Sequence, residues 1–220
     1  MEISYSQSSA YPSAYRRVDN PQSQVSNGLE IQNNMINRID FLRTEVSDVL
    51  EYLQNNSNVS LSPRVCIALL QKIGKERQTI TIKLDVINRI IYDLPDNFTN
   101  IYIGNALYGL QKLDGTDADT KRLVQALAVK VENSKAVLDA QAIGNALYGL
   151  QKLDGTDATT KRLVQALAVK VENSTAVLDA QAIGNAMYGL QKLDGTDAAT
   201  KRLVEALAEK VENSNAVLNA

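Results

Sequence analysis

The sequence predicts an all-α protein, a right-handed type of α-α solenoid with about four 40-residue helical-hairpin repeats behind an N-terminal helix. Residues 101–140, 141–180 and 181–220 are one unit written three times. The second and third copies differ at six positions, and the first two differ at four: 101/141, 102/142, 119/159 and 135/175. Apolar residues recur at helical spacing, and no stretch alternates as a strand would. Such a period is typical of stacked units that bury their apolar faces against one another.

Three segments precede the exact copies. Residues 1–27 are rich in Ser, Gln, Asn and Tyr and predict a disordered tail. Residues 28–60 contain a long predicted helix at 28–54, which we expect to cover the open end of the repeat stack, with dimerisation as the alternative. Residues 61–100 align with the unit at an offset of 40 and predict a divergent first repeat. The helix at 28–54 has a seam of coiled-coil type, formed by Met35, Ile39, Leu42, Val46, Val49 and Leu53.

Each exact copy predicts two helices, described here for 141–180. The first runs from about Ala140 to Leu153, with Asp139 as its N-cap. Its two glycines, Gly144 and Gly149, each cost a helix roughly 0.5–1 kcal/mol. We therefore expect the neighbouring repeat's backbone to approach closely at both.

A short turn joins the two helices of the unit. We expect Gly155 to take the left-handed conformation that ends a helix. Thr156 or Asp157 then caps the second helix, which runs to about Glu172. The Asp114/Asp117, Asp154/Asp157 and Asp194/Asp197 pairs lie on such turns, so we interpret them as caps rather than as catalytic carboxylates.

A polar stripe lies opposite the apolar face of each first helix. Asn and Gln carry both a donor and an acceptor, and Tyr offers a flat apolar face with a hydroxyl. Stacking would superpose these side chains into a ladder suited to an extended ligand, either a peptide or a single nucleic-acid strand. The predicted partner-binding residues are Asn105, Tyr108, Lys112, Gln141, Asn145, Tyr148, Lys152, Gln181, Asn185, Tyr188 and Lys192. The alternative is that Asn145 caps a neighbouring turn and that Tyr148 packs between repeats.

The composition excludes several kinds of chemistry. The chain has no His and one Cys, which removes Ser-His-Asp and Cys-His nucleophile pairs, His-ligated metals and Cys-rich zinc sites. Cys66 lies in an apolar run and is expected to be a small buried hydrophobe. We therefore predict no enzyme activity, no cofactor and no metal.

No signal peptide or transmembrane segment is recognised in the sequence. We expect an intracellular protein, cytoplasmic or otherwise, with no membrane partner; secretion as a bacterial effector is an open alternative.

The segment from Leu138 to Leu153 resembles the first helix of octotricopeptide-type repeats and is similar to the helical repeats that accompany RAP-domain proteins. That helix often reads Ala-Gln-x-x-(Ala)-Asn-x-x-(Trp)-(Ala)-Leu, which Gln141, Asn145, Tyr148 and Leu150 match, Tyr148 standing where Trp is common. The resemblance covers residues 99–220. It implies an α-solenoid that binds single-stranded RNA, as found in organelle RNA processing and in some host-associated bacteria.

The charge of the repeats favours a different partner. The three copies together carry a net charge of −1, whereas phosphate neutralisation supplies much of the affinity for nucleic acid. We therefore predict a non-catalytic scaffold that presents its concave face to a protein or peptide. Single-stranded RNA is the second prediction, and self-association through 28–54 or by end-to-end stacking is the third.

Overall fold

The computed structural model describes residues 44–216, and every regular element in that range is a helix. Two helices of each exact copy are joined through a short 3₁₀ segment and a turn. The α-helices are α2 (Val46–Asn55), α3 (Pro63–Gly74), α4 (Leu84–Tyr92), α5 (Asn100–Gly109), α6 (Ala118–Asn133), α7 (Ala140–Tyr148), α8 (Ala158–Glu172), α9 (Ala180–Gly189) and α10 (Ala198–Glu212). The 3₁₀-helices are η2 (Leu110–Lys112), η3 (Gly149–Lys152) and η4 (Leu190–Lys192). The predicted all-α class is confirmed.

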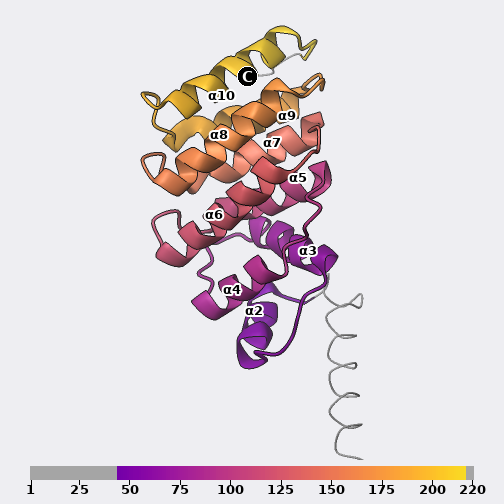
Figure 1. Ribbon diagram of the computed structural model, residues 1–220, viewed down its shortest axis with the longest axis vertical. Coiled ribbons are helices and arrows are strands. Elements are labelled where there is room, and N and C mark those ends of the chain that lie inside the picture. The colour runs from indigo at the N-terminus through magenta and orange to yellow at the C-terminus, as the bar shows by residue number, and fades with distance from the viewer. Residues whose placement is uncertain (1–43, 217–220) are drawn as a thin grey trace, which may run out of the picture.

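The helices form two layers that run along the length of the molecule (Figure 1). In one layer α3, α5, α7 and α9 pack in succession, and in the other α4, α6, α8 and α10 do the same. The interior helices α5, α6, α7 and α8 therefore each contact the equivalent helix of the preceding and of the following unit. This packing is that of a helical solenoid.

Aspartates at the expected positions start the helices. Asp139 accepts a hydrogen bond from the Ala142 N–H at 2.7 Å, as predicted for the N-cap of α7. Of the two candidates for the cap of α8, Asp157 holds the position and accepts from the Thr159 N–H at 2.9 Å.

The first helix of each unit ends differently from the prediction. The α-helix α7 stops at Tyr148, and the stretch expected to continue to Leu153 is the tighter η3, which ends at Lys152. Leu153 is extended, with φ −72° and ψ 145°. Short 3₁₀ segments commonly end α-helices, because their bonds satisfy carbonyls that the last turn leaves free.

The helical glycines lie where the prediction placed the approach of neighbouring backbones. A Cβ on Gly144 would come within 2.9 Å of the Ala182 Cα, and one on Gly149 would overlap the Leu107 carbonyl. The expectation for Gly155 was wrong, because its backbone does not take the left-handed conformation. Like Gly144 and Gly149, Gly155 lies against the backbone of a neighbouring unit. A Cβ at this position would lie 2.5 Å from the Lys192 carbonyl oxygen.

One continuous apolar core runs between the two layers, and a repeated serine bond joins successive units around it. The Ser174 hydroxyl donates to the Leu138 carbonyl at 2.6 Å and accepts from the Ala176 N–H at 3.0 Å. Ser134 and Ser214 make the same pair of bonds, 40 residues earlier and later. Cys66 is buried as expected, and burial, with a smaller contribution from Asp93, raises the pKa of its thiol to about 12.

The N-terminal part of the description begins inside the predicted helix at 28–54. Glu45 is extended, so the helix there starts only at Val46. Val46, Val49 and Leu53 are buried where α2 packs against α3 and α4. The rest of the predicted seam (Met35, Ile39 and Leu42) and the tail at 1–27 lie outside the described residues. Within the described range no helix combines the length and the apolar character needed to cross a bilayer.

Candidate functional site

The residues of the predicted stripe are carried by α5, α7 and α9 and by the 3₁₀ segments that follow them. Because α5 packs on α7 and α7 on α9, equivalent residues of the three helices become neighbours. The predicted ladder is therefore a real alignment along one layer of the stack. Its three kinds of side chain differ in what they contact.

The tyrosines of the stripe stack on one another. The ring centroids of Tyr108 and Tyr148 are 5.9 Å apart with an interplanar angle of 19°, and those of Tyr148 and Tyr188 are 5.4 Å apart at 28°. These separations suit offset stacking, which is worth ~0.5–1.5 kcal/mol per pair beyond burial. No ligand ring fits between neighbouring members of this column. The column can therefore present to a ligand only its ring edges, its hydroxyls and the outer face of Tyr188, which is 51% exposed.

The asparagines are half-buried beside the tyrosines, whereas Gln141 and Gln181 are exposed at the starts of α7 and α9. Asn105 accepts a hydrogen bond at 3.0 Å from the Gln71 amide of the preceding unit. One side-chain amide of the stripe thus makes a hydrogen bond within the stack, whereas the amides of the two exposed glutamines are accessible to solvent.

Two lysines of the stripe, Lys152 and Lys192, lie near a carboxylate of a turn. Lys152 and Lys192 help to lower the pKa of Asp114, although the larger causes are the bonds from the Thr116 N–H and hydroxyl. Lys152 also donates to the Thr79 hydroxyl at 2.6 Å. Of the row Lys112, Lys152 and Lys192, the last two therefore have an opposite charge nearby.

The paired aspartates of the turns act as predicted. Asp154 accepts from the backbone and hydroxyl of Thr156, at 2.9 and 2.7 Å, while Asp157 caps α8. Asp157 also pairs with Lys121 of the preceding unit at 2.8 Å. The bond from Lys121, followed by that from Thr159, lowers the pKa of Asp157 to about 2. Within residues 44–216 no group of three or more metal-ligating side chains is present.

Sequence reasoning missed the ionic contacts between units. Arg162 pairs in a bidentate manner with Glu132, at 2.7 and 2.6 Å, and Arg202 repeats this with Glu172 at 2.6 Å twice. Lys161 lies 3.2 Å from Asp197 and 3.6 Å from Asp194. The signal was present, since each basic residue recurs with acidic ones 30, 33 or 36 positions away, but it becomes visible only when the helices are stacked.

A buried glutamine was missed for the same reason. Gln111 and Gln151 are 4% and 8% exposed, and Gln151 donates to the Gln111 side chain at 3.5 Å and to the Tyr148 carbonyl at 2.9 Å. In the sequence this residue directly precedes the lysine of the stripe, but the neighbouring unit covers it.

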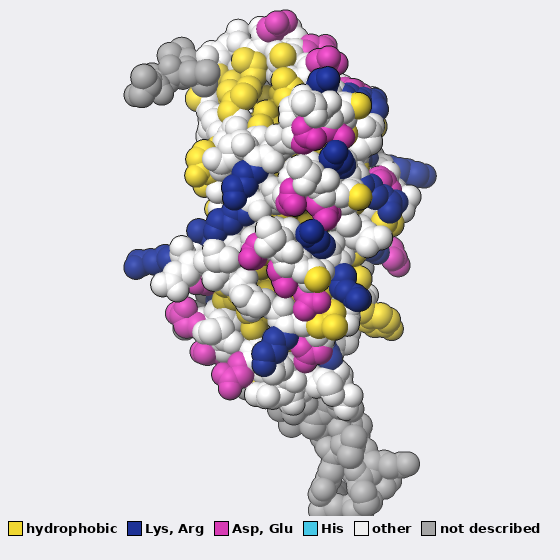
Figure 2. Space-filling model, turned by 90° about the vertical axis from the view of Figure 1, so that its left-hand side faces the viewer, with side chains coloured by type: hydrophobic (Ala, Val, Ile, Leu, Met, Phe, Trp, Pro, Cys, Tyr) yellow, Lys and Arg dark blue, Asp and Glu magenta, His cyan; other side chains and the backbone are white. Residues whose placement is uncertain are grey.

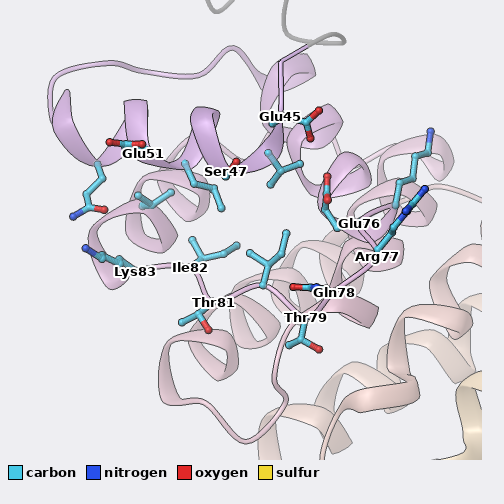
Figure 3. Close-up of a pocket in the computed structure, with 16 residues that line it drawn as sticks. Glu45, Ser47, Glu51, Glu76, Arg77, Gln78, Thr79, Thr81, Ile82 and Lys83 are labelled. Atoms are coloured by element: carbon cyan, nitrogen blue, oxygen red, sulfur yellow. The ribbon is translucent and has the colours of Figure 1, made fainter.

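A groove of about 680 Å³ lies between α2 and the connection at residues 75–83, and Lys152 of the stripe contacts Thr79 in its wall. Figure 3 shows Glu45, Ser47 and Glu51 on one wall and the connection, with Arg77 and Lys83, on the other. Three acidic and three basic residues line it, so it has no net preference for one sign of charge.

Comparison with protein-family models, with curated proteins and with solved structures finds no match for this chain. The resemblance of 99–220 to octotricopeptide-type repeats therefore rests on the residues quoted above. The candidate site is a stacked tyrosine column bordered by half-buried asparagines, by exposed glutamines and by a row of lysines.

Proposed function

We propose that this chain is a non-catalytic binding scaffold. In this proposal a right-handed solenoid of about four 40-residue repeats presents its stripe, on a concave face, to an extended macromolecular partner. A protein or peptide segment is the favoured partner. The observation that supports the proposal is the tyrosine column, which holds hydroxyls and amides of successive units in register on one layer.

The dimensions of the stripe suit an extended peptide. Neighbouring tyrosine rings of the column are 5.9 and 5.4 Å apart. An extended chain rises ~3.3 Å per residue, so about every second residue of a peptide would meet the same set of groups. Exposed Gln141 and Gln181 can each give a donor and an acceptor to a peptide backbone.

Charge supports a peptide over a nucleic acid. Asp114 lies close enough to Lys192 and Lys152 for both positive charges to contribute to the lowering of its pKa. A phosphate chain laid along the lysines would meet these turn carboxylates as well. Closed stacking of the tyrosines also removes the gaps into which bases would insert.

Single-stranded RNA is the second candidate, on the resemblance stated above and on the lysine row. The observation that favours it is the exposed position of Lys192 beside the free face of Tyr188. One base could stack there while its phosphate contacts the lysine.

One experiment separates the two partners. The full chain is presented to a random peptide library and to a random single-stranded RNA pool, and enriched ligands are measured at two salt concentrations. The proposal expects peptide binding that falls at least about tenfold, the effect of losing ~1.4 kcal/mol, when Gln141 and Gln181 are both changed to Ala. Helicity should remain unchanged in this variant.

The matched control changes Lys75, Lys83 and Lys135, exposed lysines outside the stripe, to Glu. Salt-sensitive RNA retention that is lost in Lys112→Glu/Lys152→Glu/Lys192→Glu, but kept in this control, would replace the peptide proposal with RNA. Enrichment of neither ligand would overturn the proposal that the stripe binds extended polymers.

A further inference from the structure

The glutamine that directly precedes the lysine of each unit makes different hydrogen bonds in different units. Gln71 donates to the Asn105 side chain of the next unit at 3.0 Å. Gln151 donates instead to the Tyr148 carbonyl of its own unit at 2.9 Å and to the Gln111 side chain of the preceding unit at 3.5 Å. One repeated side chain therefore has two alternative sets of acceptors in the same stack.

Gln111, between these two glutamines, donates to neither kind of acceptor. Its side chain is 4% exposed, and its Nε2 atom is buried without a hydrogen-bond partner among residues 44–216. The acceptor that would match the bond from Gln71 is the side chain of Asn145, 34 positions further on, which makes no side-chain hydrogen bond to the described residues. A buried donor without a partner destabilises a folded protein, so this one requires an explanation.

The bond from Gln71 decides which group Asn105 can offer to a ligand. Because the side-chain oxygen of Asn105 accepts from Gln71, the hydrogens of its amide nitrogen remain, and no described residue accepts them. An asparagine held in this way presents a donor, and its complement is a hydrogen-bond acceptor. Donation from Gln111 to Asn145 would hold the second asparagine in the same sense.

Charge does not provide this selectivity. Figure 2 shows basic and acidic side chains interspersed along one face of the molecule. Ion pairs between units, such as Lys121 with Asp157 and Lys161 with Asp197, repeat along the stack. The uncharged amides of the stripe instead match a carbonyl oxygen, an acceptor that every residue of a peptide main chain carries.

We propose that the asparagines of the stripe donate hydrogen bonds to main-chain carbonyl oxygens of the bound peptide, and that glutamines of the preceding units orient them. This inference rests on the peptide binding proposed above. Gln71 orients Asn105 before the peptide binds. Asn145 is oriented on binding, when its amide donates to a peptide carbonyl and its own oxygen accepts from Gln111. Gln111 is thus a positioning residue, because the bond that it gains in the complex adds to the affinity.

The first test removes the donors and keeps the oxygens that accept the internal bonds. The full chain is used, and the probe is a peptide enriched from the random library whose binding is lost in Gln141→Ala/Gln181→Ala. Asn105→Asp and Asn145→Asp have no side-chain N–H to give, so each should raise the dissociation constant at least about tenfold. Asn88→Asp adds the same charge on α4, in the other layer, and should leave binding unchanged.

The second test separates positioning from packing. Gln111→Met keeps an unbranched side chain of similar size without the amide. It should raise the urea midpoint of the free protein, because a buried donor without a partner is removed, yet weaken peptide binding about five- to tenfold. In NMR spectra of the full chain, the Nε2 hydrogens of Gln111, assigned by their loss in this variant, should shift downfield when the peptide is added.

The outcomes distinguish this inference from the proposed function. Peptide binding that is unchanged or tighter in Asn105→Asp and Asn145→Asp would overturn the inference, while loss in Gln141→Ala/Gln181→Ala still supported the peptide site. Amide signals of Gln111 that stay fixed on binding, or a Gln111→Met variant with both stability and affinity lowered, would overturn its positioning role. If the parent chain retains no peptide, the proposed function fails and this inference fails with it.

Discussion

The units at 141–180 and 181–220 differ at only six of 40 positions, yet equivalent side chains in the two units have different environments. Val164 is 1% exposed and Val204 is 44% exposed, although both lie at the same position of the same sequence motif. Tyr148 has a stacked ring on each side, whereas Tyr188 has one. The comparison teaches that in a stack of this kind burial belongs to the interface between units and not to the unit.

The largest expected difference between the two units comes from a buried charge. Val164→Asp should destabilise the protein by about 4 kcal/mol or more, because it places an unpaired carboxylate between α6, α8 and α10. Val204→Asp should change the free energy of unfolding by less than about 0.5 kcal/mol. Urea unfolding followed by far-UV circular dichroism checks both. Similar losses in the two variants would mean that α10 is covered as α8 is.

A second matched pair should give effects of opposite sign. Gly144→Ala should destabilise by about 1–3 kcal/mol, because its Cβ meets the backbone of Ala182. Gly184→Ala should stabilise by roughly 0.5–1 kcal/mol, because alanine is the better helix former and its Cβ enters open space. The measurement is the same unfolding experiment. Stabilisation by both substitutions would contradict the close approach of α7 and α9.

The smallest expected effect is a pH dependence at an interior junction. Asp157 has a pKa of about 2 in the folded protein because Lys121 and Thr159 donate to it, and about 3.9 when unfolded. Its contribution is therefore fully present above about pH 4 and is lost as the pH falls toward 2. Asp157→Asn should lower stability by about 1 kcal/mol at neutral pH and flatten its decline in this window. The same slope in the variant and the parent between pH 4 and 2 would rule out this role.

Much of the fold could be predicted from the 40-residue period and the helical spacing of apolar residues. The caps at Asp139 and Asp157 and the burial of Cys66 followed from local chemistry, because a cap or a small apolar residue answers to its immediate neighbours in the chain. The extent of the first helix and the conformation of Gly155 did not. Both depend on the backbone of an adjacent unit. The residue pattern of a single repeat does not specify that contact.

The sequence predicted which residues of the candidate site share a stripe, but it did not predict that the tyrosine rings stack on one another. Helical spacing placed Asn145, Tyr148 and Lys152 on one stripe, and tandem copying implied a row of each. Whether the tyrosines separate to admit a ligand or stack on one another depends on the distance between α5, α7 and α9. That distance is set by glycines such as Gly144, which bring the backbones together.

The sequence by itself determined that this protein is a stack of helical hairpins without imidazole chemistry, because periodicity and composition are properties of the chain alone. Only the tertiary structure decided which equivalent side chains of the three near-identical units are buried and which charges are paired. It also decided which glycines lie against the backbone of a neighbouring unit. The physical reason is that these properties arise at contacts between units. Val204 of α10 is therefore exposed, whereas the equivalent Val164 of α8 is buried.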